Sequence, residues 1–308
     1  MPFSNRSMLW LLVFLSATPS SLRAGERLRF GILPVVDTLP LLVAESEGLF
    51  TREGIDLEIV QFQSALERDA ALQAGRLDGY FGDLLNTILL VRAGERLGIV
   101  TTVFHTHPEH RMFGIAVSPG SGVRSLDGLR HKTVAISRTT VIEYLLDRIL
   151  ERHGLPADYL VKEEIKKIPI RLQMLLADQV AAALLPEPLL TLAESRGARV
   201  IADDRDLDTS ETVLALAAKG GGNSVDVGGF LRAYGEAVNR INRSPESYKD
   251  LLLEKTRFPA EVKDRYRVPI FPEVKLPSEA DVGRVQEWLI DSGVMERRLP
   301  YEAVIYRK

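Results

Sequence analysis

The chain has 308 residues, of which 45% are hydrophobic and 26% charged, and its formal net charge is −3. This length suits two domains of ordinary size, and the composition is that of a well-cored globular protein. The mildly acidic balance argues against a nucleic-acid partner, and the absence of cysteine excludes disulfides, thiolate metal sites, cysteine nucleophiles and a lipidated N-terminal cysteine.

The N-terminal residues have the pattern of a signal peptide. Arg6 precedes an uninterrupted apolar run at 8–17, which is too short to span a bilayer as a helix. A polar stretch follows, and cleavage after Ala24 fits the pattern. An uncleaved anchor or a buried N-terminal helix is the alternative. We expect residues 1–24 to be removed and the mature protein, lacking a lipid anchor, to be free in a periplasm.

Strands and helices alternate along the first part of the mature chain. Short runs of alternating or continuous apolar residues predict strands, and capping residues and glycines bound the helices between them. In chain order, the pattern predicts strands at 27–32, 56–62, 77–81, 99–105 and 112–117, with helices over 38–49, 64–75 and 83–92.

The same alternation continues in the second part. We expect strands at 133–137, 180–185, 199–202 and 212–217, and helices over 140–154, 172–177 and 188–196. The segment from 225 to 308 is expected to be mostly helical, with breaks at Pro245, Pro259, Pro269, Pro272 and Pro277. Alternating strands and helices indicate βαβ units and mainly parallel sheets covered on both faces. Segments 72–83 and 176–187 both run from a helix end through a strand to an acidic residue and the next helix, as two lobes of similar architecture would.

Polar side chains gather where the predicted strands end. In open parallel sheets, ligands bind outside the carboxyl ends of the strands, beside unpaired N–H groups at helix starts. This rule selects ten candidate ligand-binding residues: Asp37, Thr38, Gln63, Ser64, Asp83, Ser137, Arg138, Thr139, Thr140 and Glu187.

Each candidate also has a purely structural interpretation. Ser64 and Thr140 are suited to cap helices, and an acid such as Asp83 or Glu187 is favoured at a helix start. Arg138 is the only cation in the set, and a solvated loop arginine is an equal alternative. Three acids against one arginine favour a ligand with N–H donors or an amine, such as an aminopyrimidine. A sulfonate held by backbone N–H groups remains possible.

A histidine cluster, His105-Thr-His107-Pro-Glu-His110, stands apart from this set. It offers three imidazoles within six positions, but no separate, well-spaced ligand reinforces it, so we assign no metal ligand here and leave metal binding by the cluster as the alternative. The sequence also contains no serine-hydrolase, metalloprotease or phosphate-loop motif. No catalytic residue and no cofactor are therefore expected.

Several runs of the chain resemble one family. The run from Leu39 to Leu84 is similar to ABC-transporter substrate-binding proteins of the sulfonate, nitrate, taurine and thiamine-pyrimidine-precursor group, and so are 125–137, 183–189 and 285–289. The resemblance implies an α/β, two-lobed, type 2 periplasmic-binding fold, in which each lobe is a mainly parallel sheet flanked by helices. Lobe one would comprise 25–118 and 212–308, lobe two 119–211, and two crossing strands near Val117 and Thr212 would form the hinge.

The family resemblance also implies function and partners. It implies a monomer that clamps a small polar molecule between its lobes and delivers it to an ABC permease and ATPase complex in the inner membrane. Asp37, Thr38, Ser64, Asp83, Thr139 and Glu187 fall where the cleft loops of this family lie. A periplasmic sensor that docks on a signalling partner is the alternative. A pyrimidine-biosynthetic enzyme is disfavoured, because the enzymes of that kind that resemble this family carry a cysteine-rich iron-binding motif.

Overall fold

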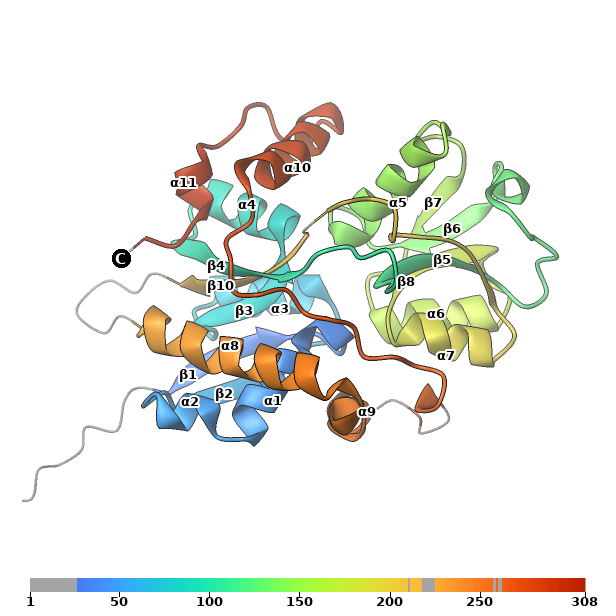
Figure 1. Cartoon of the computed structure of the whole chain (residues 1–308). Coiled ribbons are helices and arrows are strands. Elements are labelled where there is room, and N and C mark those ends of the chain that lie inside the picture. Colours follow the sequence, from blue (N-terminus) through green and yellow to red (C-terminus); the bar gives the residue numbers. More distant parts are fainter. Residues whose placement is uncertain (1–26, 210, 218–224, 257–258, 260–261, 308) are drawn as a thin grey trace, which may run out of the picture.

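The computed structural model describes residues 27–209, 211–217, 225–256, 259 and 262–307. The expected signal peptide lies outside these residues, and so does the run Lys219-Gly-Gly-Gly-Asn223, for which the sequence predicts a turn. Within the described part, the chain forms two five-stranded mixed sheets, each flanked by helices (Figure 1). We call each sheet with its helices a lobe. No helix in the described part is long and apolar enough to cross a membrane.

The first lobe is built on a sheet of order β2-β1-β3-β10-β4. Four of its strands run in the same direction, and β10 runs antiparallel between β3 and β4. Every residue of β3 and β4 is buried, as expected for strands covered on both faces. The strands are β1 (Leu28–Ile32), β2 (Leu57–Gln61), β3 (Gly79–Asp83), β4 (Leu97–Phe104) and β10 (Thr212–Ala217).

The second lobe repeats this arrangement in the order β7-β6-β8-β5-β9. Here β5 takes the antiparallel position, between β8 and β9. The resemblance of the two sheets agrees with the similarity of the two sequence segments. The strands are β5 (Phe113–Val117), β6 (Thr133–Ile136), β7 (Val161–Glu164), β8 (Ala182–Pro186) and β9 (Arg199–Asp203).

Helices flank both sheets. The first lobe carries the 3-10 turns η1 (Val36–Thr38) and η3 (Pro245–Tyr248), and helices α1 (Leu39–Ser46), α2 (Leu49–Arg52), α3 (Ala65–Gln73), α4 (Leu84–Arg92), α8 (Val227–Arg243), α9 (Lys249–Thr256), α10 (Glu279–Asp291) and α11 (Tyr301–Val304). The second lobe carries η2 (Leu126–Leu129), α5 (Val141–Arg152), α6 (Ile168–Leu176) and α7 (Leu189–Ser195).

Two segments carry the chain between the lobes. The first joins β4 to β5, and the second joins β9 to β10 (Figure 1). They are paired at their middle, where the Thr106 backbone N–H donates to Thr209 O at 2.9 Å and the Thr209 N–H donates to Thr106 Oγ1 at 2.8 Å. Each lobe therefore receives its antiparallel strand directly from a crossing segment.

The position of β5 differs from the expected lobe boundary at Ser118. The strand was expected at the end of lobe one, whereas it pairs with β8 and β9 of the second sheet. A run of apolar residues identifies a strand but does not show its pairing partners. We therefore propose lobe boundaries within the crossing segments, at 105–112 and 204–211.

The C-terminal part has a long break between its helices, at prolines where breaks were expected. Residues 266–278 form an extended segment that runs along β4, where the Thr102 N–H donates to Lys275 O at 2.7 Å. Prolines at 269, 272 and 277 explain the lack of helix, since proline cannot donate its backbone hydrogen bond. Strand β7, in contrast, was not predicted. Its sequence, Val-Lys-Glu-Glu, is largely charged and exposed, as is usual at a sheet edge.

Candidate functional site: a cavity between the lobes

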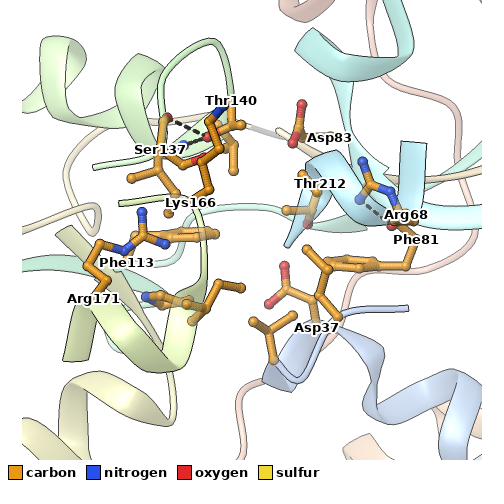
Figure 2. A pocket seen from close by; sticks show the side chains of 18 residues that line it. Asp37, Arg68, Phe81, Asp83, Phe113, Ser137, Thr140, Lys166, Arg171 and Thr212 are labelled. Atoms are coloured by element: carbon orange, nitrogen blue, oxygen red, sulfur yellow. Dashed lines mark hydrogen bonds between the residues drawn. The ribbon is translucent and has the colours of Figure 1, made fainter. Parts of the chain in front are cut away.

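A cavity lies between the two lobes, a common place for small-molecule sites (Figure 2). Its walls come from the carboxyl ends of strands and from the first turns of α3, α5 and α6. The lining residues are Leu33, Val35, Asp37, Ala65, Arg68, Phe81, Gly82, Asp83, Phe113, Ser137, Thr140, Val141, Ile142, Lys166, Ile168, Arg171, Pro186 and Thr212.

Arg171 brings a positive charge into this cavity from the second lobe. The side chain is only 1% exposed, and its Nε and Nη1 have no hydrogen-bond partner among the described residues. Burial lowers the pKa of its guanidinium to about 10, so the group stays charged at neutral pH. A buried cation without partners is costly, and an anionic group on a ligand would offset that cost.

Asp37 and Thr212 form part of the opposite wall, which belongs to the first lobe (Figure 2). Asp37 is 1% exposed, and no well-aligned hydrogen bond from the described residues reaches its carboxylate oxygens. The Thr212 hydroxyl lies near enough to favour the charged carboxylate. Burial raises the pKa of Asp37 to about 7. The cavity therefore offers an acceptor or, when protonated, a donor across from the Arg171 cation.

Asp83 lies on the same wall, at the junction of β3 and α4. Its Oδ1 accepts from the Asn86 N–H at 2.7 Å, which caps α4 as the sequence indicated. Burial raises the pKa of Asp83 to about 6, opposed chiefly by the positive charge of Arg68. Asp83 thus combines the capping role and the position in the cavity that the sequence left as alternatives.

Arg68, in contrast to Arg171, has hydrogen-bond partners within the protein for all three of its guanidinium nitrogens. Its Nη1 donates to Phe81 O at 2.7 Å, its Nε and Nη2 both contact Asp69, and its guanidinium stacks over the Tyr80 ring with 4.4 Å to the centroid. These contacts hold the end of β3 against α3. Arg68 therefore shapes the wall beside Asp83 and leaves Arg171 as the cation without a compensating acid.

The start of α5 forms another part of the wall, through Ser137, Thr140 and Val141. Thr140 caps the helix, since its Oγ1 accepts from the Ile142 N–H at 3.2 Å and donates to Ser137 O at 2.8 Å. The positive end of this 12-residue helix therefore faces the cavity and adds to the field that favours an anion.

Direct contacts close the cavity between the lobes. The Val36 N–H donates to Glu187 O, and the Ile168 N–H donates to Gln63 O, both at 3.3 Å. Further along the cleft, Lys167 pairs with Glu67 at 3.3 Å. On the α10 side, Trp288 Nε1 donates to Asp147 Oδ2 of α5 at 3.0 Å. The structure therefore has the lobes in contact around the cavity.

Four of the ten candidate residues line the cavity: Asp37, Asp83, Ser137 and Thr140. Ser64 instead caps α3 by accepting from the Glu67 N–H, and the Thr38 hydroxyl donates to Val35 O. Gln63 takes part through its backbone in the contact between the lobes.

The other three candidates lie beside the cavity rather than in its lining. The Thr139 N–H and the Arg138 guanidinium both contact Glu143, and Arg138 also donates to Lys162 O. The Glu187 carboxylate binds Arg111 at 2.9 Å and the Thr191 hydroxyl at 2.8 Å. Glu187 is therefore engaged by neighbouring side chains and, unlike Asp83, does not line the cavity.

The sequence analysis did not identify Arg68 or Arg171 as cavity residues. Its rule selects residues directly after strands, and both arginines lie within helices. Arg171 lies one turn into α6, on the face that also carries Ile168, Leu172 and Leu175, all buried. A lone arginine on an apolar helical stripe is the signal that could have identified it, since a charge is rarely buried without a purpose.

Comparisons with known proteins agree with this architecture. A family model described as NMT1/THI5 like matches residues 36–246. A putative aliphatic sulfonates-binding protein of Bacillus subtilis is 30% identical over 118 residues, which cover 37% of this chain. That match spans about a third (34%) of the length of the curated relative.

Solved structures show the same fold over nearly the whole chain. The ligand-binding component of an ABC-type import system from Staphylococcus aureus has a TM-score of 0.77 at 15% identity, covering 91% of this chain and 97% of that one. The alkanesulfonate-binding protein of Xanthomonas axonopodis has a TM-score of 0.76 at 19% identity, covering 92% and 98%. The periplasmic aliphatic sulphonate binding protein of Escherichia coli has a TM-score of 0.73 at 21% identity, covering 92% of each chain.

The expected fold class is thus confirmed, as two helix-flanked mixed sheets with the architecture of periplasmic binding proteins. The family model covers well over half of the chain, from the first 3-10 turn into η3, just after α8. The chain belongs to the NMT1/THI5-like family.

Proposed function

We propose that this protein is the solute-binding component of an ABC importer and that its ligand is a small organic anion held between the lobes. The observation that carries the proposal is the Arg171 guanidinium, buried in the cavity with two nitrogens unpartnered. A solute-binding role accords with the family and with the names of the similar proteins, which include sulfonate-binding and import components.

The side chains that line the cavity indicate two further properties of the ligand. Apolar side chains such as Phe81, Phe113 and Ile142 supply much of the wall, and this suits a short hydrocarbon body. Asp37, on the wall opposite Arg171, suits an N–H donor or an amine at another end of the ligand. The expectation of an amine-bearing ligand is therefore retained as part of the proposal, with an anionic group added because of Arg171.

A matched ligand series tests this proposal. Propanesulfonate, 3-aminopropanesulfonate and the neutral propanesulfonamide have similar size, and differ in the groups that Arg171 and Asp37 would meet. Ligand binding raises the melting temperature by mass action. We expect both sulfonates to raise it more than the sulfonamide, with the amino compound strongest. Equal shifts for the sulfonate and the sulfonamide would contradict an anion site.

Export and partners belong to the same proposal. The protein would be cleaved after Ala24, act in the periplasm as a monomer, and pass its ligand to a membrane permease with its ATPase. Intact-mass analysis of the periplasmic fraction should find a chain that begins at Gly25. A mass that includes Met1, or one that carries a lipid, would contradict export as a free protein.

A further inference from the structure

The turn at 107–110 lies on the first crossing segment, outside the cavity lining. Its sequence is His-Pro-Glu-His. The two histidines face each other as an isolated antiparallel bridge, with ring centroids 5.5 Å apart, and the His110 N–H donates to His107 O at 3.1 Å. The backbone of this turn therefore brings two imidazoles to the same side.

Glu109 completes a three-ligand group in the same turn. One ligand atom from each of His107, Glu109 and His110 lies within 4.8 Å of the others. The Glu109 N–H donates to His107 Nδ1 at 3.2 Å and so orients that ring. In this tautomer the ring proton lies on Nε2, so a metal bound at Nε2 requires the proton to move to Nδ1 and replaces this hydrogen bond. The third histidine of the sequence cluster is separate, because His105 Nε2 lies 3.2 Å from Asp208.

We propose that His107, Glu109 and His110 bind a divalent transition-metal ion, with zinc as the best match. Two imidazoles and one carboxylate are a common ligand set for zinc, and a water molecule completes the tetrahedron. Bonds of about 2.0–2.1 Å place tetrahedral ligands roughly 3.3 Å apart. The half-exposed histidines and the exposed Glu109 need to move by about 1 Å or slightly more to reach that spacing.

Neighbouring charges set the strength of this site. Arg111 is the next residue along the chain, but its charge is balanced by Glu187 and Glu194. Arg265 and Arg267 line the same hollow as His110, and the charge of Arg267 disfavours a positive charge at His110. The site should therefore bind zinc in the micromolar range rather than as tightly as a closed structural site. Bound zinc would fix the turn between β4 and β5 without entering the cavity.

Calorimetric titration of the tag-free, chelator-treated protein with zinc tests the proposal. We expect one equivalent to bind, with a dissociation constant in the micromolar range, and His107→Ala and His110→Ala each to weaken binding at least tenfold. His153→Ala is the matched control, since His153 is exposed at the end of α5. It should bind zinc as the unmodified protein does.

Cobalt(II) provides a second readout, because its visible absorption reports a tetrahedral site with nitrogen ligands. The spectrum should appear with the unmodified protein and the His153 variant and be lost when His107 and His110 are replaced together. Zinc binding that survives this double replacement, or no saturable binding below millimolar zinc, would overturn the proposal. Ligand binding in the cavity is measured separately, so either proposal can fail without the other.

Discussion

Arg171 is the residue on which ligand affinity should depend most. A charge-assisted hydrogen bond contributes about 1.5–3 kcal/mol, so Arg171→Gln should weaken propanesulfonate binding roughly ten- to a hundredfold. The free energy of unfolding should stay the same or rise, because the variant removes an unpartnered buried cation.

Arg138→Gln is the matched control for this prediction. Arg138 contacts Glu143 and Lys162 O outside the cavity lining, and its side chain is 49% exposed. Calorimetry should find its affinity for propanesulfonate close to that of the unmodified protein. Equal losses in both arginine variants would mean that general surface charge, and not the cavity, attracts the anion.

Asp37 should make stability depend on pH. Its pKa is about 7 in the folded protein and about 3.9 when unfolded, so the folded state binds more protons between these values. The contribution of this group to the free energy of unfolding is therefore greatest below about pH 4 and is lost as the pH rises through 7. Asp37→Asn removes this dependence. Relative to the unmodified protein, the variant should gain stability between pH 5 and pH 8.

Urea unfolding at the two pH values checks this expectation. The comparison between variant and unmodified protein is needed because Asp204 and Glu211, also buried, have raised pKa values of about 7 and 8. Their contributions are common to both proteins and cancel in the difference. A stability difference that is the same at pH 5 and pH 8 would show that Asp37 is ionised to the same extent throughout.

Some residues that cap helices at the strand ends line the cavity, and others do not. Ser64 caps α3 and does not line the cavity, whereas Thr140 caps α5 and does. Ser64→Ala should therefore lower the free energy of unfolding by about 1 kcal/mol and leave affinity for propanesulfonate unchanged. Urea unfolding and calorimetry on one preparation give both values. A clear loss of affinity would place Ser64 in the binding site after all.

The sequence was a good guide to elements and a partial guide to the site. Most strands were predicted to within two residues, because buried strands have distinct apolar runs; β7 was missed because an exposed edge strand has none. The strand-end rule found Asp37 and Asp83. It could not find Arg171, whose position in the cavity depends on how α6 packs between its sheet and the other lobe.

At the scale of the whole molecule, the two lobes are joined by paired crossing segments and meet again around the cavity. Contacts such as Ile168 N–H to Gln63 O and Lys167 to Glu67 lie at the edge of the cleft and link α6 to α3. A hinge at the crossing segments would break these contacts when the lobes separate.

Glu67→Lys sets two cations, the introduced lysine and Lys167, against each other at the edge of the cleft. It should weaken propanesulfonate binding in calorimetry without changing a residue that lines the cavity. The double variant Glu67→Lys with Lys167→Glu should restore affinity.

Failure of the double variant to restore affinity would show that this ion pair does not contribute to closure of the two lobes.

The chain contains no cysteine, so cysteines for a pair of spin labels can be introduced without interference. Gln73 on α3 and Gln173 on α6 are both exposed and belong to different lobes.

The distance between spin labels at these two positions tests the central claim most directly, because it reports closure of the cleft around an anion. With saturating propanesulfonate, pulsed electron paramagnetic resonance should show a shorter and narrower distance distribution in the labelled protein. The labelled protein that also carries Arg171→Gln should keep its ligand-free distribution at the same concentration. A distribution that propanesulfonate leaves unchanged at saturation, or that shortens equally in the Arg171 variant, would contradict the account.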